Sequence, residues 1–166
     1  MCNDAPKAVK LGADLVEARL DHLWTTEEKI PSTEKSEEGE KPSFKTIVKN
    51  LELDAIDVEA SIQTISASVE VPLLFTCRPQ RQGGHYPGSE EDRLSVLEAA
   101  IESQPNWIDI EVDIDPSKRE ELVKLAGKET RVIASIHSLE GVPSASEITQ
   151  DVLDSQGMGD LVKAWY

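Results

Sequence analysis

Cysteine is scarce in this sequence, and long hydrophobic runs are absent. Two cysteines, Cys2 and Cys77, occur in 166 residues, which is too few for a disulfide framework and favours a reducing compartment. No stretch approaches the roughly 20 consecutive apolar residues that a membrane-spanning helix needs, and the N-terminal segment has no signal-peptide core. We therefore predict a cytoplasmic protein with no membrane partner.

Basic residues are few relative to acidic ones. The chain has 17 lysines and arginines against 32 aspartates and glutamates, for a formal net charge of −15 at pH 7. This charge repels nucleic acid and no basic patch interrupts it, so we expect no nucleic-acid partner. Many acidic residues lie in a polar stretch at about residues 25–43. We interpret it as a solvated, partly disordered insertion, rather than an interaction tail, in one domain that spans residues 1–166.

Apolar segments of strand length alternate with helix-like segments in the rest of the chain. Helix start signals stand at Ser89, Pro116 and Ser144, and residues 44–69 are also predicted to be helical. Successive predicted strands are separated by the length of a βαβ unit, which indicates an α/β fold with parallel strands. The predicted strands are residues 13–20, 73–77, 107–114, 132–136 and 161–165.

Polar side chains recur on one face of these strands. A parallel sheet that is buried on both faces is made almost entirely of Val, Ile and Leu. Polar residues at alternate positions of these strands all point to one face, so that face must border a polar environment. The residues concerned are Glu17, Arg19, Thr76, Arg78, Asp109, Glu111, Asp113, Ser135, His137 and Lys163.

The lumen and mouth of a (β/α)8 barrel of the TIM type provide such an environment. In that fold the C-terminal ends of the strands carry the active site, and Arg78 and His137 lie at strand ends. An open doubly wound sheet is the alternative, but the glycine-rich phosphate turn that usually follows its first strand is absent. We therefore predict a barrel.

Lys163 is the strongest functional signal, because a lysine inside the apolar segment 160–165 is unfavourable unless chemistry uses it. A lysine amine that has lost its hydration is a nucleophile that can condense with a ketone to form a Schiff base. The alternative is a lysine whose stem lies along the strand while its ammonium reaches water. His137 on a neighbouring strand favours catalysis, because a histidine side chain titrates near neutral pH and can transfer protons.

Five segments occur in a fixed order along the chain. They are Gly12–Asp21, Phe75–Arg78 with Gly83–Gly84 after it, Ile108–Glu111, Val132–His137 and Gly159–Lys163. In sequence, order and spacing they resemble the motifs of the type I 3-dehydroquinate dehydratases. The resemblance implies a lyase of the shikimate pathway, which makes aromatic amino acids. This enzyme removes water from 3-dehydroquinate to give 3-dehydroshikimate, through a lysine imine and without a metal or an organic cofactor.

The resemblance also implies roles for individual residues. Lys163 matches the imine-forming lysine, and His137 matches the residue that transfers protons. Glu17 and Arg19 match a pair that contacts the substrate hydroxyls, and Arg78 matches a substrate-binding arginine. From the residues alone, an internal salt bridge between Glu17 and Arg19, a surface position for Arg78 and a buried, backbone-bonded His137 are the alternatives.

Two further positions are candidates for supporting the site. The family commonly has a glutamate directly before its paired glycines, where it can hydrogen-bond the catalytic histidine, and this chain has Gln82. We predict slower proton transfer if Gln82 faces His137, because an amide does not stabilise imidazolium as a carboxylate does. Ser135 shares the strand face of His137. The glycines at 83–84 fit either a mobile loop near the substrate or a simple turn.

The length predicts an incomplete barrel. Complete barrels of this type need about 200 residues or more, so we expect a fragment that lacks the family's first strand and its last two βα units and keeps about five of eight strands. Such a sheet exposes two edges, which invites pairing with another chain, and a homodimer is one such pairing. Two other functions stay open: a class I Schiff-base aldolase-like enzyme, and an inactive half-barrel that binds a partner through its edges.

Overall fold

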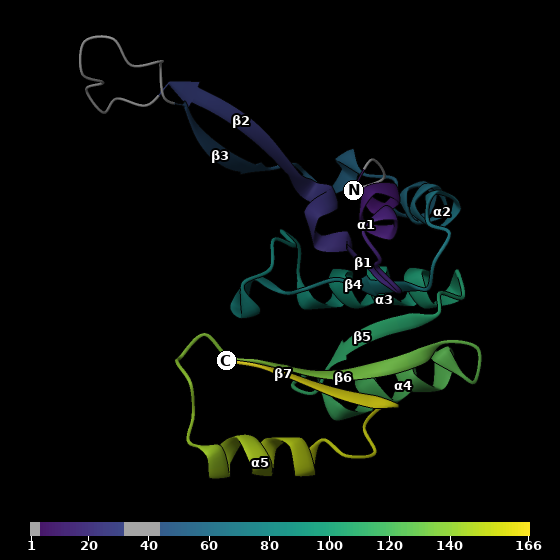
Figure 1. Cartoon of the computed structure of the whole chain (residues 1–166), viewed down its shortest axis with the longest axis vertical. Helices are drawn as coiled ribbons and strands as arrows, with labels where there is room; N and C mark the ends of the chain where they lie inside the picture. The colour runs from purple at the N-terminus through teal and green to yellow at the C-terminus, as the bar shows by residue number, and fades with distance from the viewer. Residues whose placement is uncertain (1–3, 32–43) are drawn as a thin grey trace.

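The computed structural model describes residues 4–31 and 44–166, and its centre is a parallel five-stranded sheet (Figure 1). The strands are β1 (Val16–Arg19), β4 (Leu73–Thr76), β5 (Trp107–Glu111), β6 (Arg131–His137) and β7 (Leu161–Trp165). They lie side by side in the order β1-β4-β5-β6-β7. Strands that follow one another in this sheet are also neighbours in space, as in a barrel, whereas the order reverses in a doubly wound sheet.

The five predicted strands are confirmed, and the largest differences in their bounds are at the start of β1 and the end of β5. The first begins at Val16 rather than at residue 13, and β5 ends at Glu111 rather than at residue 114. The chain turns after Glu111 because Asp115 caps the next helix, accepting hydrogen bonds from the backbone of Ser117 and Lys118. The prediction that Asp113 shares the inner strand face is therefore wrong. Its carboxylate instead binds Arg81 outside the sheet.

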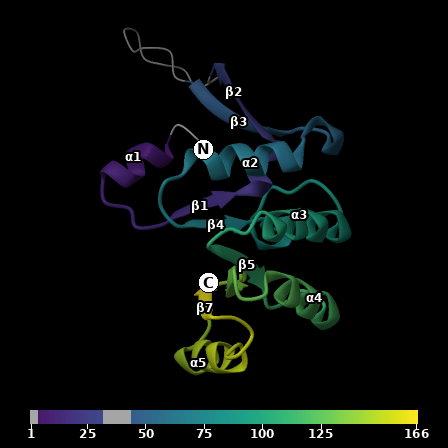
Figure 2. The same ribbon diagram turned by 90° about the vertical axis from the view of Figure 1, so that its right-hand side faces the viewer.

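The predicted helix starts are confirmed, and helices α2 to α4 pack along one side of the sheet (Figure 2). Ser89 and Ser144 cap their helices through reciprocal side-chain and backbone hydrogen bonds. The helices are α1 (Ala5–Lys10), α2 (Val58–Ser68), α3 (Glu90–Glu102), α4 (Pro116–Ala126) and α5 (Ala145–Asp154). Within the described ranges, no helix is long and apolar enough to cross a membrane.

An antiparallel hairpin of β2 (Thr25–Pro31) and β3 (Phe44–Asn50) projects away from the sheet (Figure 1). The interpretation of residues 25–31 as a solvated loop is therefore wrong, and so is the helical prediction for residues 44–50. These segments pair with each other across an intervening stretch, and such non-local pairing is invisible to local sequence patterns. The rest of the predicted insertion, residues 32–43, lies outside the described residues.

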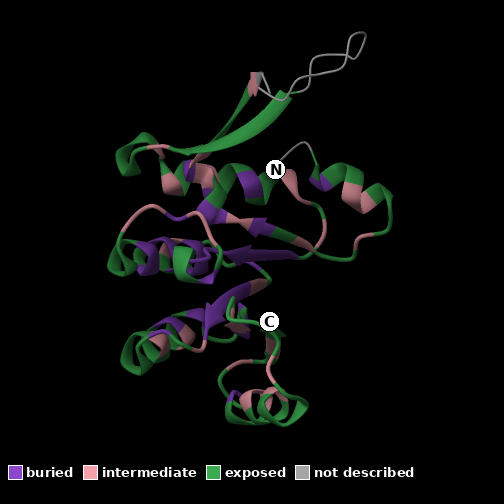
Figure 3. Ribbon diagram, turned by 90° about the vertical axis from the view of Figure 1, so that its left-hand side faces the viewer, coloured by how far each residue is buried: buried purple, intermediate pink, exposed green. Residues whose placement is uncertain are grey.

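The core fills the space between the sheet and its helices, and the residues coloured as buried lie mainly on the central strands and on α3 (Figure 3). The outward strand face carries apolar residues such as Phe75, Ile108 and Ile110, all fully buried. The opposite face buries Asp109 and Ser135 instead, which confirms the predicted segregation of polar residues. The sheet is open in the described part of the chain, with β1 and β7 at its edges.

Candidate active site

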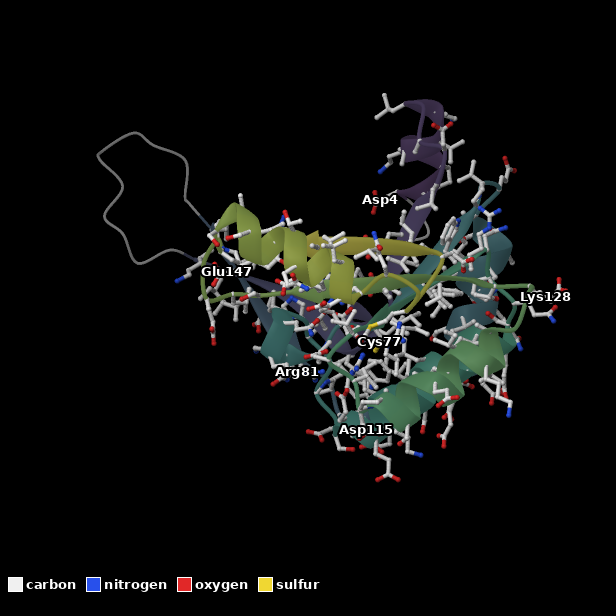
Figure 4. The ribbon with its side chains drawn as sticks, turned by 90° about the horizontal axis from the view of Figure 1, so that it is seen from below. Asp4, Cys77, Arg81, Asp115, Lys128 and Glu147 are labelled. Carbon is white, nitrogen blue, oxygen red and sulfur yellow. The ribbon has the colours of Figure 1, made fainter. Side chains whose placement is uncertain are left out.

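The polar face of the sheet opens into a cavity of about 320 Å³ at the C-terminal ends of the strands. Figure 4 shows the two ends of the sheet: Arg81 and Glu147 follow strand C-termini at one end, and Lys128 precedes β6 at the other. The lining residues are Glu17, Arg19, Arg78, Gln82, Gly83, His137, Leu139, Lys163 and Trp165. The structure therefore brings together every predicted site residue except Ser135, which lies directly beneath this layer.

Lys163 extends from β7 into the cavity between two carboxylates. Its Nζ lies 3.3 Å from Oδ2 of Asp109 and 3.7 Å from Oε1 of Glu17. Its side chain is 36% exposed, so the amine is only partly removed from water. The strand accommodates the lysine because the inner face supplies opposite charges. The two carboxylates hold the amine at the wall of the cavity.

Glu17 and Arg19 do not pair with each other, although they share the inner face of β1. Glu17 accepts a hydrogen bond of 2.7 Å from Oγ1 of Thr76 and lies near Lys163. Arg19 donates two hydrogen bonds to Asp21. The alternative of an internal Glu17–Arg19 salt bridge is therefore wrong, and both side chains reach the cavity from separate partners.

Arg78 is a buried cation, not a surface arginine. Its side chain is 3% exposed. NH2 donates to Asp109 at 2.9 Å, and NH1 donates to Glu111 at 2.9 Å and to Ser135 at 3.0 Å. NH1 also lies 3.4 Å from Oε1 of Gln82, so its two hydrogens are shared among three acceptors. The guanidinium compensates two carboxylates that would otherwise be buried together.

A chain of side chains with alternating positive and negative charge runs from Arg78 toward the surface. Glu111 also binds NH1 of Arg93 at 3.0 Å, and Arg93 binds Glu90 at 2.7 Å. Arg93 is 1% exposed and also donates to the carbonyl of Cys77. Sequence reasoning missed Arg93. The signal was present, because Arg93, Leu97 and Ala100 fall on one helical face, so that an arginine lies on the apolar side of α3.

His137 ends β6 beside Lys163 on β7, and its ring stacks on Trp165 with centroids 6.2 Å apart. Its Nδ1 is buried and has no hydrogen-bond partner in the part of the chain that the structure describes, so the backbone-bonded alternative is wrong. Burial, assisted by the positive charges of Arg78 and Lys163, lowers the pKa of His137 to about 4. The imidazole is therefore neutral at neutral pH and can accept a proton.

The stability of the fold should depend on pH through His137. Its pKa is about 4 in the folded chain and about 6.5 in an unfolded one, so between these pH values the unfolded chain binds the extra proton. The stabilisation is fully present above pH 6.5 and is lost as the pH falls toward 4. In His137→Asn, we expect the unfolding free energy to fall less between pH 7 and pH 4.5, by on the order of 1 kcal/mol. The expected difference is small because the ring is partly exposed and water screens its charge.

Urea unfolding of both proteins at the two pH values measures this difference. His22, whose pKa is also lowered by burial, is present in both proteins, so its contribution cancels. The same pH dependence in the two proteins would show that His137 does not titrate differently on folding.

The segment after β4 is a tight turn that forms one wall of the cavity. Gln82 contacts Arg78 at 3.4 Å. It lines the same cavity as His137, although no hydrogen bond joins the two side chains among the described residues, and the slower proton transfer stays a prediction. Gly83 adopts a left-handed conformation with φ of 75°. A Cβ on Gly84 would lie 1.9 Å from the carbonyl oxygen of Arg78. The left-handed conformation thus accounts for Gly83, and close backbone packing accounts for Gly84.

The fold and the cavity define a class: an α/β protein built on part of a singly wound barrel, with a polar site at the C-terminal ends of its strands. Comparison with known proteins narrows this class. The sequence matches the family model of type I 3-dehydroquinase over residues 1–165. The chain belongs to the type I 3-dehydroquinase family.

Several known proteins are similar to this chain in sequence or in structure. The 3-dehydroquinate dehydratase of Methanocaldococcus jannaschii is 31% identical over 137 residues, which cover 76% of this chain and 61% of the relative. The chloroplastic bifunctional 3-dehydroquinate dehydratase/shikimate dehydrogenase of Arabidopsis thaliana is 32% identical over 98% of this chain and 22% of its own length. The structure of 3-dehydroquinate dehydratase from Enterococcus faecalis superposes with a TM-score of 0.73 at 24% identity, over 98% of this chain and 59% of that one.

This chain therefore spans little more than half the length of the single-function relatives that it matches. The structural likeness supports the predicted TIM-barrel-like fold, of which the described strands form an open part.

Proposed function

We propose that this chain carries the Schiff-base site of a 3-dehydroquinate dehydratase, a hydro-lyase. The observation that supports this most directly is the shared cavity of Lys163 and His137, which lie on neighbouring strands. An amine and a neutral imidazole are the two groups that dehydration through an imine requires. Relatives named 3-dehydroquinate dehydratase supply the substrate by analogy.

The proposed reaction begins when Nζ of Lys163, in its neutral form, attacks the substrate ketone and water leaves as the iminium forms. The iminium withdraws electrons from the adjacent carbon, and His137 accepts a proton from that carbon to give an enamine. The enamine then expels the hydroxyl group of the next carbon, which leaves as water with the proton that His137 returns. Hydrolysis of the remaining imine releases 3-dehydroshikimate and regenerates the amine.

The other cavity residues hold the reactants. Glu17 and Arg19 are partly exposed and face the cavity, so we assign them to the substrate hydroxyls. Arg78 already donates to Asp109, Glu111 and Ser135. Its main proposed role is therefore to hold Asp109, which in turn orients the amine of Lys163.

The compartment and further partners stay predictions. A cytoplasmic location and the absence of nucleic-acid and membrane partners rest on composition alone. A homodimer through the sheet edges rests on the exposure of β7, where Leu161 and Trp165 are 51% and 53% exposed.

Borohydride trapping tests the proposal. We expect the chain, mixed with 3-dehydroquinate and reduced, to gain one substrate-sized adduct that peptide mapping places on Lys163. Lys163→Met should lose the adduct, whereas Lys124→Met, which removes a lysine from the last turn of α4, should keep it. Adducts spread over exposed lysines, or an unchanged yield in Lys163→Met, would overturn the proposal.

A further inference from the structure

Asp21 is a buried carboxylate that joins three segments around the candidate site. It lies at the start of a short 3-10 helix (Leu20–Trp24) directly after β1, and its side chain is completely buried. Arg19 donates to it through Nε at 2.8 Å and NH2 at 2.7 Å. The backbone N–H groups of Arg78 and His85 donate at 3.2 Å and 3.0 Å. Four donors from three residues therefore converge on one carboxylate.

The carboxylate of Asp21 is ionised at neutral pH. Burial acts against ionisation, but Arg19 and the two backbone N–H groups outweigh it and hold the pKa of Asp21 below its usual range. Charge-assisted hydrogen bonds of this kind are stronger and geometrically stricter than neutral ones. Asp21 can therefore fix the positions of its donors relative to one another.

Both sets of donors belong to the cavity. Arg19 lines it and is 33% exposed, and among the described residues its NH1 has no hydrogen-bond partner. The guanidinium of Arg19 donates to Asp21 through Nε and NH2, and its NH1 can thus donate a hydrogen bond to an oxygen of a bound ligand. The segment between Arg78 and His85 supplies Gln82 and Gly83 to the same cavity.

A second contact supports the same junction. The rings of His22 and His85 lie with their centroids 4.6 Å apart, so the turn after β4 is joined to the 3-10 helix by side chains as well as by Asp21. The close packing of Gly84 on Arg78 leaves this turn little freedom. The internal hydrogen bonds of the turn and its close packing set its own shape, whereas Asp21 ties the turn to β1 and so sets where it lies.

We propose that Asp21 is a positioning residue, which sets Arg19 and the turn at residues 79–85 at the spacing that a hydroxyl-rich substrate requires. This inference rests on the proposed function for its ligand, 3-dehydroquinate. Asp21 does not itself line the cavity, so it acts through Arg19 and through the wall.

Asp21→Asn tests the inference, because the amide keeps the shape and loses the charge and one acceptor. We expect the concentration of 3-dehydroquinate that gives half-maximal borohydride adduct to rise by about tenfold to a hundredfold, with the maximal adduct yield kept. In an Arg19→Gln background the same change should have little additional effect, because the two residues act as one unit. Asp115→Asn, which removes a carboxylate that also accepts from backbone N–H groups but lies at the exposed start of α4, should leave both quantities unchanged.

Amide hydrogen exchange measures how firmly Asp21 holds the turn, and it does not require the chain to react with 3-dehydroquinate. The amides of Arg78 and His85 should exchange about tenfold faster or more in Asp21→Asn, while those of α3 stay as they were. Faster exchange throughout α3, or a lower yield at an unchanged half-saturating concentration, would show a merely structural role and overturn the inference. If the unaltered chain forms no adduct, the proposed function fails. Exchange at these two amides then still decides whether Asp21 holds the turn, and unchanged exchange overturns the inference.

Discussion

Arg78→Met is expected to lower the free energy of unfolding by about 3–5 kcal/mol, because it leaves buried carboxylates without their cation. Asp109 and Glu111 are both fully buried, and each lies 2.9 Å from the Arg78 guanidinium. Methionine replaces the aliphatic stem but none of the charge. A loss of this size is a large part of the total stability of a small domain, about 5–15 kcal/mol. Urea denaturation followed by circular dichroism measures it.

Arg81→Met is the matched control. Arg81 also bridges two carboxylates, Glu90 and Asp113, at 3.0 Å and 3.1 Å, but its side chain is 44% exposed. Water screens these pairs, and we expect the change to lower the unfolding free energy by less than about 1 kcal/mol. Similar losses for the two variants would show that burial of the Arg78 network does not control the stability of the sheet.

His137→Asn is expected to slow dehydration by about 100- to 10,000-fold while leaving the Lys163 adduct intact. The reason is a separation of tasks. In the proposed reaction, Lys163 forms the imine through its own Nζ, and the neutral imidazole of His137 removes the proton from the neighbouring carbon. The low pKa of His137, about 4, keeps that imidazole neutral at the pH of the assay. Borohydride trapping measures imine formation, and the absorbance of the conjugated product measures dehydration.

Lys163→Met provides the contrast, because it should lose the adduct and the turnover together. If His137→Asn also failed to form the adduct while remaining folded, His137 would be needed for imine formation rather than for the later proton transfer. Undiminished turnover in His137→Asn would assign the proton transfer to another group, of which Glu17 is the nearest partly exposed carboxylate to Lys163.

The sequence predicted most of the sheet because its strands are short, apolar on one face and bounded by strong helix caps. Ser89 and Ser144 cap their helices as their local sequence indicates, since capping depends on residues only three positions apart. The hairpin of β2 and β3 was missed because its stabilising partners lie on the other strand. The end of β5 was placed too late, since apolar alternation continues past the point where the chain turns.

The candidate site was predictable as a set of residues but not as a set of contacts. Alternation along each strand places Glu17, Asp109 and Lys163 on the inner face, and this parity holds wherever the strands form. Which of these groups touch one another depends on the register between strands, which pairs Ser135 with Lys163 and Glu111 with Ser135. The ion pairs of Lys163 with Glu17 and Asp109 follow from this tertiary arrangement.

The sequence by itself determined the family, the order of the strands in the parallel sheet, and the lysine and histidine on which the proposed chemistry depends. Each of these follows from local spacing or from an ordered set of motifs. Only the tertiary structure decided that Arg78 is a buried counter-ion, that Arg93 reaches the same network from α3, and that Asp21 joins Arg19 to the turn after β4. The physical reason is that the energy of a charge is set by its burial and by partners far away in sequence, and these exist only once the chain has folded.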